Sequence, residues 1–233
     1  IVKKVLYVLH QKTSVAGDVG NKFRERGYSE EIVRPPLGDK LPTDLSKYSA
    51  VVIFGGPMSV NDDDQFIKDE IKWMKKVIQS KIPFLGICLG AQILAKYLGC
   101  DVVKNENDLA EIGFYEIKPV GEGDHIFRHQ NIFYQFHTEG FEVPQGCHLL
   151  ARGDVFKNQA FRYENCYALQ FHPEVNLFVH LRWLFFILIK KPKVLFLNGS
   201  QNLFYQLYLR FKYNKSVSIW LDSFLDNYLL AHK

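Results

Sequence analysis

The segment PFLGICLGAQILAKYLG, residues 83–99, decides the fold because it joins a buried strand to a helix with no loop between them. Residues 83–88 form a continuous apolar run, which is typical of a strand covered on both faces of its sheet. From Leu89 the pattern becomes helical, and Gly99 is a typical residue just past a helix end. A strand that leads directly into a helix is the repeating unit of α/β proteins. The segment therefore predicts a mostly parallel central sheet flanked by helices.

Two apolar runs upstream, KVLYVLH at 4–10 and AVVIFGG at 50–56, predict further strands of this sheet. An amphipathic helix is expected between the second run and Pro83, which no helix would pass. Its apolar face consists of Ile67, Ile71, Met74 and Ile78.

From about 101 to 175 the apolar runs shorten and turn residues recur more often, which predicts antiparallel strands, as an extension of the sheet and as hairpins. The expected strands are EIGFYEIKPV (111–120), NIFYQFH (131–137), HLLARGD (148–154), QAFRYEN (159–165) and CYALQFH (166–172).

Residues 176–233 form an aromatic-rich segment in which the spacing of apolar residues predicts helices. We expect this segment to belong to a single domain that spans residues 1–233. Two interpretations of its aromatic residues stay open at this point: they are core, or they form a docking surface for a second copy or a partner. The expected helical faces are Leu177, Leu181, Leu184 and Leu188, then Val217, Leu221, Phe224 and Tyr228, and the docking candidates are Phe185, Phe186 and Phe196.

Composition excludes several classes of protein. Hydrophobic residues make up 47% of the 233 residues and charged residues 23%, which is typical of a folded globular chain. A formal charge of +4 with scattered basic residues does not indicate a nucleic-acid surface, and no apolar run reaches the length of a membrane span. The absence of a secretory cleavage pattern and of paired cysteines favours a cytoplasmic protein with reduced thiols.

The pattern GICLG at 86–90 places Cys88 between a strand and a helix, as a nucleophile elbow does. The start of the helix favours a thiolate and directs the amide of Leu89 toward a developing oxyanion. On its own, a cysteine in this position is more commonly a small buried side chain. FHPEV at 171–175 changes that balance, because His172 and Glu174 lie two residues apart in an extended segment and can point to the same side. A base oriented by a carboxylate is what a cysteine nucleophile requires.

Three motifs in this order, FGGPMSVND (54–62), GICLGAQ (86–92) and LQFHPEV (169–175), resemble those of the class I glutamine amidotransferases. EIGF (111–114) and FHTEGFEVP (136–144) are similar to segments of stand-alone members that resemble the amidotransferase half of GMP synthase. The resemblance implies a flavodoxin-like fold over about residues 3–175.

The resemblance also implies roles for individual residues. Cys88 would be the nucleophile, His172 the general base and acid, and Glu174 the residue that orients His172. The main-chain amides of Gly56 and Leu89 would form the oxyanion hole. The substrate would be bound by Gln92, His137, Thr138 and Glu139, of which the last three form a loop that acts through its main chain.

Three positions depart from the family pattern, and they leave open which γ-glutamyl compound fits: Met58, Phe114 and Glu139. Four acidic residues suggest a metal site only weakly, since the run at 62–64 leads into a helix, where carboxylates favour the helix dipole. We therefore expect no metal and no cofactor. The acidic residues considered were Glu111, Asp62, Asp63 and Asp64.

The activity that the resemblance implies is hydrolysis of the side-chain amide of glutamine to glutamate and ammonia through a cysteinyl thioester. Two alternatives stay open: a γ-glutamyl peptide hydrolase, and a catalytically weak regulatory or binding subunit. The roughly 58 residues after Val175 are too few for a synthetase domain. Ammonia, if used, would therefore pass to a separate synthetase such as a GMP-synthase-type partner, and the chain would associate with that partner or with a second copy.

Overall fold

The computed structural model describes residues 3–231 and contains, within them, an eight-stranded sheet in the order β2-β1-β3-β4-β12-β11-β10-β7. The first five strands of this order pair in parallel, and the last three extend the sheet in antiparallel fashion. The strands are β1 (Lys4–Val8), β2 (Ser29–Val33), β3 (Ala50–Ile53), β4 (Phe84–Ile87), β7 (Lys118–Pro119), β10 (His148–Arg152), β11 (Asn158–Tyr163) and β12 (Cys166–Leu169).

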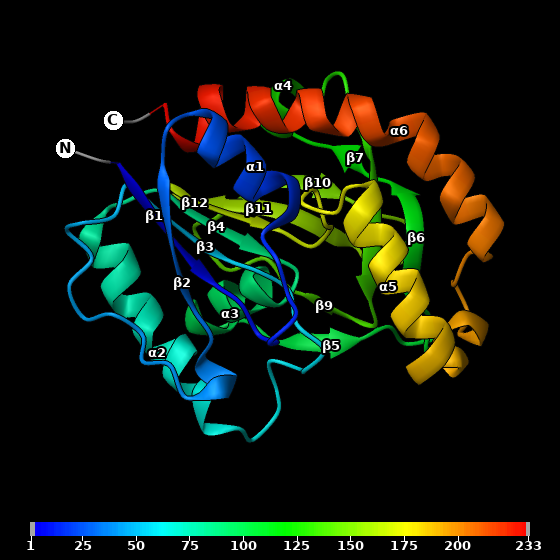
Figure 1. Ribbon diagram of the computed structural model, residues 1–233, viewed down its shortest axis with the longest axis horizontal. Coiled ribbons are helices and arrows are strands. Elements are labelled where there is room, and N and C mark those ends of the chain that lie inside the picture. Colours follow the sequence, from blue (N-terminus) through cyan, green and yellow to red (C-terminus); the bar gives the residue numbers. More distant parts are fainter. Residues whose placement is uncertain (1–2, 232–233) are drawn as a thin grey trace.

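Helices cover both faces of the sheet, which gives the three layers visible in Figure 1. The first and sixth helices pack on one face, and the second and third pack on the other, because successive side chains of each central strand point to opposite faces. The helices are α1 (Gly17–Glu25), α2 (Gln65–Ser80), α3 (Leu89–Tyr97), α4 (Gly123–Ile126), α5 (Leu177–Lys190) and α6 (Leu203–Phe224). A π-helical turn, Leu225–Leu229, continues α6, and short 3₁₀ turns lie at Pro35–Leu37 and Pro192–Phe196.

Two smaller antiparallel sheets flank this core. β5 (Val102–Lys104) pairs with β9 (Glu139–Phe141), and β6 (Glu111–Glu116) pairs with β8 (Ile132–His137). The predicted α/β class with a parallel centre and an antiparallel extension is therefore confirmed. One detail differs from the prediction: β12 also pairs in parallel with β4, so it belongs to the centre of the sheet as well as to the extension.

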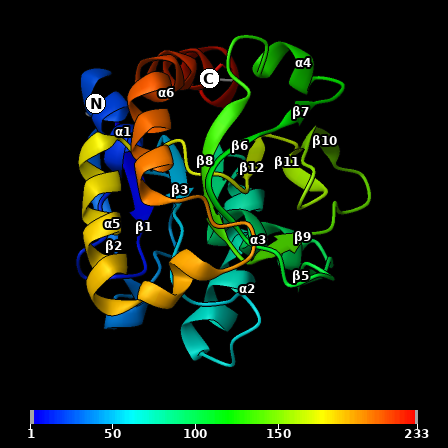
Figure 2. The ribbon, with the colours of Figure 1, turned by 90° about the vertical axis from the view of Figure 1, so that its right-hand side faces the viewer.

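The C-terminal segment folds into α5 and α6, which lie side by side in Figures 1 and 2. The predicted inward face of α5 was wrong: Leu181 and Leu188 are exposed, and the buried residues are Val179, His180, Leu184 and Ile187. Apolar residues surround most of this helix, so their spacing alone does not identify the inward side. The predicted face at the end of α6 was correct, since Val217, Leu221 and Phe224 are buried and Tyr228 packs against them.

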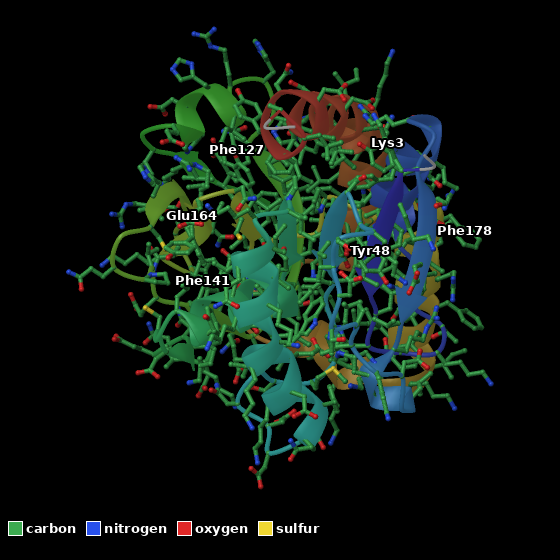
Figure 3. All side chains as sticks on the ribbon, turned by 90° about the vertical axis from the view of Figure 1, so that its left-hand side faces the viewer. Lys3, Tyr48, Phe127, Phe141, Glu164 and Phe178 are labelled. Atoms are coloured by element: carbon green, nitrogen blue, oxygen red, sulfur yellow. The ribbon has the colours of Figure 1, made fainter. Side chains whose placement is uncertain are left out.

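Many aromatic side chains of the C-terminal segment do not enter the core. Phe185 is 67% exposed, Phe186 is 47% exposed and Phe196 is 84% exposed. Phe178, which is also exposed, lies at the outer margin of the molecule in Figure 3. The interpretation that all of these residues are core is therefore wrong, whereas their role in docking stays a prediction. Within the described part of the chain, no helix combines the length and the apolar character needed to cross a membrane.

Candidate active site

Cys88 lies in the turn between β4 and α3 in a conformation that residues other than glycine rarely adopt, with φ of 50° and ψ of −105°. Close backbone packing requires the two flanking glycines. A Cβ on Gly86 would lie 2.6 Å from the backbone of Gly90, and one on Gly90 would lie 2.2 Å from the carbonyl oxygen of Ile53. The sharp strand-to-helix turn predicted from GICLG is therefore present, with Cys88 at the N-cap position of α3.

His172 and Glu174 form a buried pair just beyond the end of β12. The Nδ1 atom of His172 lies 2.8 Å from Oε1 of Glu174, and each side chain is only 4% exposed. Because a carboxylate accepts, Nδ1 carries the proton of this hydrogen bond. Trp183 of α5 packs its ring edge-on against the imidazole at 5.1 Å. The Nε2 atom of His172 has no hydrogen-bond partner within residues 3–231, so the ring is held from one side and its other nitrogen is available.

The sheet register brings Cys88 and His172 together. Ile87 pairs with Leu169 on the neighbouring parallel strand, so the residues after both strands leave the same edge of the sheet. The loop after β3 completes this group. A Cβ on Gly55 would lie 2.8 Å from Cε1 of His172 and 3.4 Å from Cβ of Cys88.

Charge around His172 favours the imidazolium. Burial alone would lower the pKa of His172, but the negative charges of Glu174 and then Cys88 raise it to about 10. The protonated form of His172 is therefore favoured at neutral pH, and the ring loses its charge as the pH rises through about 10. A positively charged ring beside the sulfur is the environment that a cysteine nucleophile requires.

Gln170 is a residue of the site that sequence reasoning missed, although it lies in the quoted motif LQFHPEV. It is fully buried, and its Nε2 donates to Sγ of Cys88 at 3.7 Å. Its Oε1 accepts from Nε2 of Gln92 at 3.3 Å. The position of Gln170 two residues before His172 is the signal that could have identified it, because alternate residues of an extended segment share one side.

The predicted substrate-binding residues lie beside this group. Gln92 is 4% exposed, so the alternative of an exposed helical glutamine is wrong, and its Nε2 donates to the carbonyl oxygen of Glu139 at 3.0 Å. The same carbonyl lies 2.9 Å from Nδ1 of His137. Thr138, between His137 and Glu139, is exposed. The side chain of Glu139 points elsewhere and accepts from the Ser59 hydroxyl at 2.7 Å. The loop is thus fixed through the carbonyl oxygen of Glu139, while the role of its main chain in binding substrate stays a prediction.

Glu111 belongs to a buried polar network. It is 1% exposed, and its Oε2 lies 2.9 Å from Nε2 of His137 and accepts from Gln159 at 2.8 Å. Asp64 occupies the N-cap position of α2 without a side-chain capping bond, and Asp62 instead accepts from the amide of Ser59. No group of side chains suited to holding a metal ion occurs among the described residues.

A buried cation, Arg210, interacts electrostatically with Glu174 and was not predicted. Arg210 of α6 is 1% exposed, and its guanidinium lies over the rings of Phe114 at 4.8 Å and Tyr134 at 5.5 Å. Burial lowers the pKa of Arg210 to about 10, and Glu174 is one of the groups that oppose this change.

The two predicted oxyanion amides lie on segments that border Cys88. Leu89 is the first residue of α3, where helix N–H groups have no acceptor within the helix. Gly56 follows Gly55 in the loop that approaches His172. The geometry therefore places both segments as predicted, and the use of these amides in catalysis stays a prediction.

Comparison with known proteins gives consistent results. A family model described as Glutamine amidotransferase class-I matches residues 8–191. A GMP synthase (glutamine-hydrolyzing) of Flavobacterium psychrophilum is 34% identical over 143 residues, which is 59% of this chain but only 27% of that protein. One of the subunits of the GMP synthase (glutamine-hydrolyzing) of Saccharolobus solfataricus is 31% identical over 155 residues, 64% of this chain and 78% of that one. The crystal structure of a glutamine amidotransferase from Thermotoga maritima superposes with a TM-score of 0.87 at 28% identity, covering 97% of this chain and 98% of that one.

Proposed function

This chain belongs to the class I glutamine amidotransferase family, a family that hydrolyses the glutamine amide, and we propose that it performs this reaction with Cys88, His172 and Glu174 as its catalytic triad. One observation carries the assignment. The buried His172–Glu174 pair, with Nε2 of His172 unpartnered within residues 3–231, lies at the same sheet edge as the strained Cys88.

The first half of the reaction forms a thioester. The thiolate of Cys88 attacks the side-chain carbonyl carbon of glutamine, and the carbonyl oxygen becomes an oxyanion. The amides of Gly56 and Leu89 donate to this oxyanion. When the carbon–nitrogen bond breaks, the imidazolium of His172 donates its Nε2 proton to the departing ammonia.

The second half releases glutamate. Water loses a proton to Nε2 of His172, now neutral, and attacks the thioester carbonyl. The carbon–sulfur bond breaks, Cys88 leaves as the thiolate and His172 is again an imidazolium. Glu174 keeps the same ring nitrogen protonated throughout, so Nε2 is always the atom that exchanges protons with the reactants.

The substrate side of this proposal rests on the loop at 137–139. Its main chain would hold the α-amino and α-carboxylate groups of glutamine, and Gln92 would contact the side-chain amide. Gln92 and His137 both bond to the carbonyl oxygen of Glu139, which supports a fixed loop conformation.

A panel of amides tests this function. Purified chain is incubated with L-glutamine, with a γ-glutamyl peptide such as glutathione, and with L-asparagine as a control whose chain is one methylene shorter. We expect glutamate and ammonia from glutamine and none from asparagine. Cleavage of the γ-glutamyl peptide alone would replace glutamine by peptides as the substrate. No cleavage, with Cys88 still open to alkylation, would indicate a regulatory role.

We further propose that the ammonia passes to a separate synthetase of the GMP-synthase type. The support is the similarity of the chain to the Saccharolobus relative, which is one subunit of a glutamine-hydrolyzing GMP synthase. Mixing the chain with the synthetase from its host tests this step, because glutamine should then replace ammonium salts as the nitrogen source. Product formation with ammonium salts but not with glutamine would contradict it.

A further inference from the structure

His10 and Glu70 form a buried polar pair against the loop that follows β3. His10 lies two residues past the end of β1 and is 2% exposed, and Glu70 lies in the middle of α2 and is fully buried. The Nε2 atom of His10 is 3.1 Å from Oε2 of Glu70, and its Nδ1 atom is 3.2 Å from the carbonyl oxygen of Gly55. A Cβ on Gly56 would lie 2.8 Å from Cβ of His10, so this side chain packs directly on the Gly55–Gly56 segment.

The acceptors around His10 determine where its protons lie. The carbonyl oxygen of Gly55 can only accept, so Nδ1 of His10 must donate to it. At Nε2, one proton is shared with Glu70, whose other oxygen, Oε1, has no partner among the described residues. Burying a carboxyl group lowers the free energy of unfolding unless the group has hydrogen-bond partners. Among the described residues, the partner of the Glu70 carboxyl group is His10.

The carbonyl of Gly55 and the N–H of Gly56 belong to one planar peptide, in which they point in opposite directions. A donor that fixes the oxygen therefore also fixes the direction of the N–H. This control matters here because neither residue has a Cβ, so the peptide between two glycines rotates more freely than any other. The segment also borders the reacting groups, since a Cβ on Gly55 would lie 2.8 Å from Cε1 of His172.

We propose that His10 and Glu70 are positioning residues that hold the Gly55–Gly56 peptide with the N–H of Gly56 directed at the oxyanion. The proposal rests on the proposed function, because an oxyanion forms only if the chain attacks a carbonyl carbon. Glu70 holds the imidazole from α2, the imidazole holds the carbonyl of Gly55, and the peptide presents its N–H to the reacting oxygen. α2 thereby contributes to the site without touching substrate.

Two substitutions at His10 distinguish positioning of the Gly55–Gly56 peptide from a purely structural role, in which His10 only links α2 to the sheet. In His10→Asn the side-chain nitrogen is as many bonds from Cβ as Nδ1 of histidine. This variant therefore keeps the hydrogen bond to the carbonyl of Gly55 and loses the one to Glu70. In His10→Gln the side-chain nitrogen is as many bonds from Cβ as Nε2 of histidine. This variant therefore keeps the hydrogen bond to Glu70 and loses the one to the carbonyl of Gly55. We expect kcat for glutamine to fall about 10- to 100-fold in His10→Gln, somewhat less than the loss of an oxyanion donor itself. In His10→Asn kcat should stay within about fivefold of wild type, and KM should change little in both.

Alkylation of Cys88 by iodoacetamide is the second measurement, because this reaction forms no oxyanion. We expect its rate in His10→Gln to stay within about threefold of wild type while kcat falls. Glu70→Gln is a further variant that leaves His10 in place, and it should lower kcat three- to tenfold with the same unchanged alkylation.

Three results would overturn the proposal. The first is kcat in His10→Gln within threefold of wild type, and the second is a parallel fall in kcat and alkylation, which would indicate general damage to the site. The third is a larger loss of kcat in His10→Asn than in His10→Gln, as a structural tie to Glu70 requires. A wild-type chain that hydrolyses no γ-glutamyl amide would overturn the proposed function and this proposal together, whereas the three results above leave glutamine hydrolysis by the wild type intact.

Discussion

Replacing Glu174 by glutamine removes the negative charge beside His172 and keeps the size of the side chain. The amide oxygen of glutamine can still accept from Nδ1, so the change isolates the charge from the geometry. In the wild type the pair is 2.8 Å apart and each side chain is 4% exposed, so solvent screens the interaction little. Glu106→Gln, on an exposed residue, is the matched control.

The expected loss follows from the strength of a buried charge-assisted hydrogen bond. Such bonds contribute about 1.5–3 kcal/mol, and about 1.4 kcal/mol corresponds to a tenfold change in rate. We therefore expect kcat/KM for glutamine to fall about 10- to 150-fold in Glu174→Gln and to stay unchanged in Glu106→Gln. Release of ammonia, followed with a coupled enzyme, measures both variants.

The pH profile adds a second readout of the same substitution. Glu174 helps to raise the pKa of His172, so the imidazolium of the wild type persists to alkaline pH. Without that charge burial lowers the pKa, and the alkaline limb of the profile should move to lower pH. A kcat/KM within twofold of wild type, with an unmoved alkaline limb, would refute the reasoning and leave Cys88 and His172 as a dyad.

Three further substitutions or labelling experiments have definite expected outcomes. Iodoacetamide at pH 7.5 should label Cys88 before the other thiols, since burial raises the pKa of Cys147 to about 11; mass spectrometry with the first adduct on Cys147 would contradict this. Gln170→Leu should slow this alkylation several-fold, because it removes the N–H that donates to the sulfur, and an unchanged rate would exclude that role. Gly17→Ala should lower the free energy of unfolding by about 1–3 kcal/mol, as seen by urea denaturation, because its Cβ would lie 2.1 Å from the carbonyl oxygen of Glu174; unchanged stability would show that the turn adapts.

The sequence was sufficient for the parts of the fold in which pattern and burial agree. The runs at 4–10, 50–56 and 83–88 became β1, β3 and β4, and the helix after Cys88 begins at Leu89 as predicted. The strand Ser29–Val33 and the helix Gly17–Glu25 were not assigned. Their polar and charged residues obscure the apolar pattern, because β2 is an edge strand and its residues are only partly buried.

The candidate site was predictable where residues adjacent in sequence share a motif. GICLG indicated a sharp strand-to-helix turn, and FHPEV indicated a base beside a carboxylate, because each relation is local. His10 and Arg210 were missed because their roles depend on contacts between distant segments. Arg210, for example, lies over Phe114 and Tyr134 only because α6 packs against β6 and β8.

The most direct test of the central claim is the fate of Cys88 during glutamine hydrolysis. Wild type, Cys88→Ala and Cys166→Ala are compared for release of glutamate and ammonia from L-glutamine, with circular dichroism as the check on folding. A glutamine-like electrophile, diazo-oxo-norleucine, is then added, and the adduct is located by mass spectrometry. We predict one adduct, on Cys88, and a loss of at least about 10⁴-fold in kcat/KM in Cys88→Ala alone. A folded Cys88→Ala variant that retains more than a tenth of the wild-type rate, or an adduct on another residue, would contradict the account.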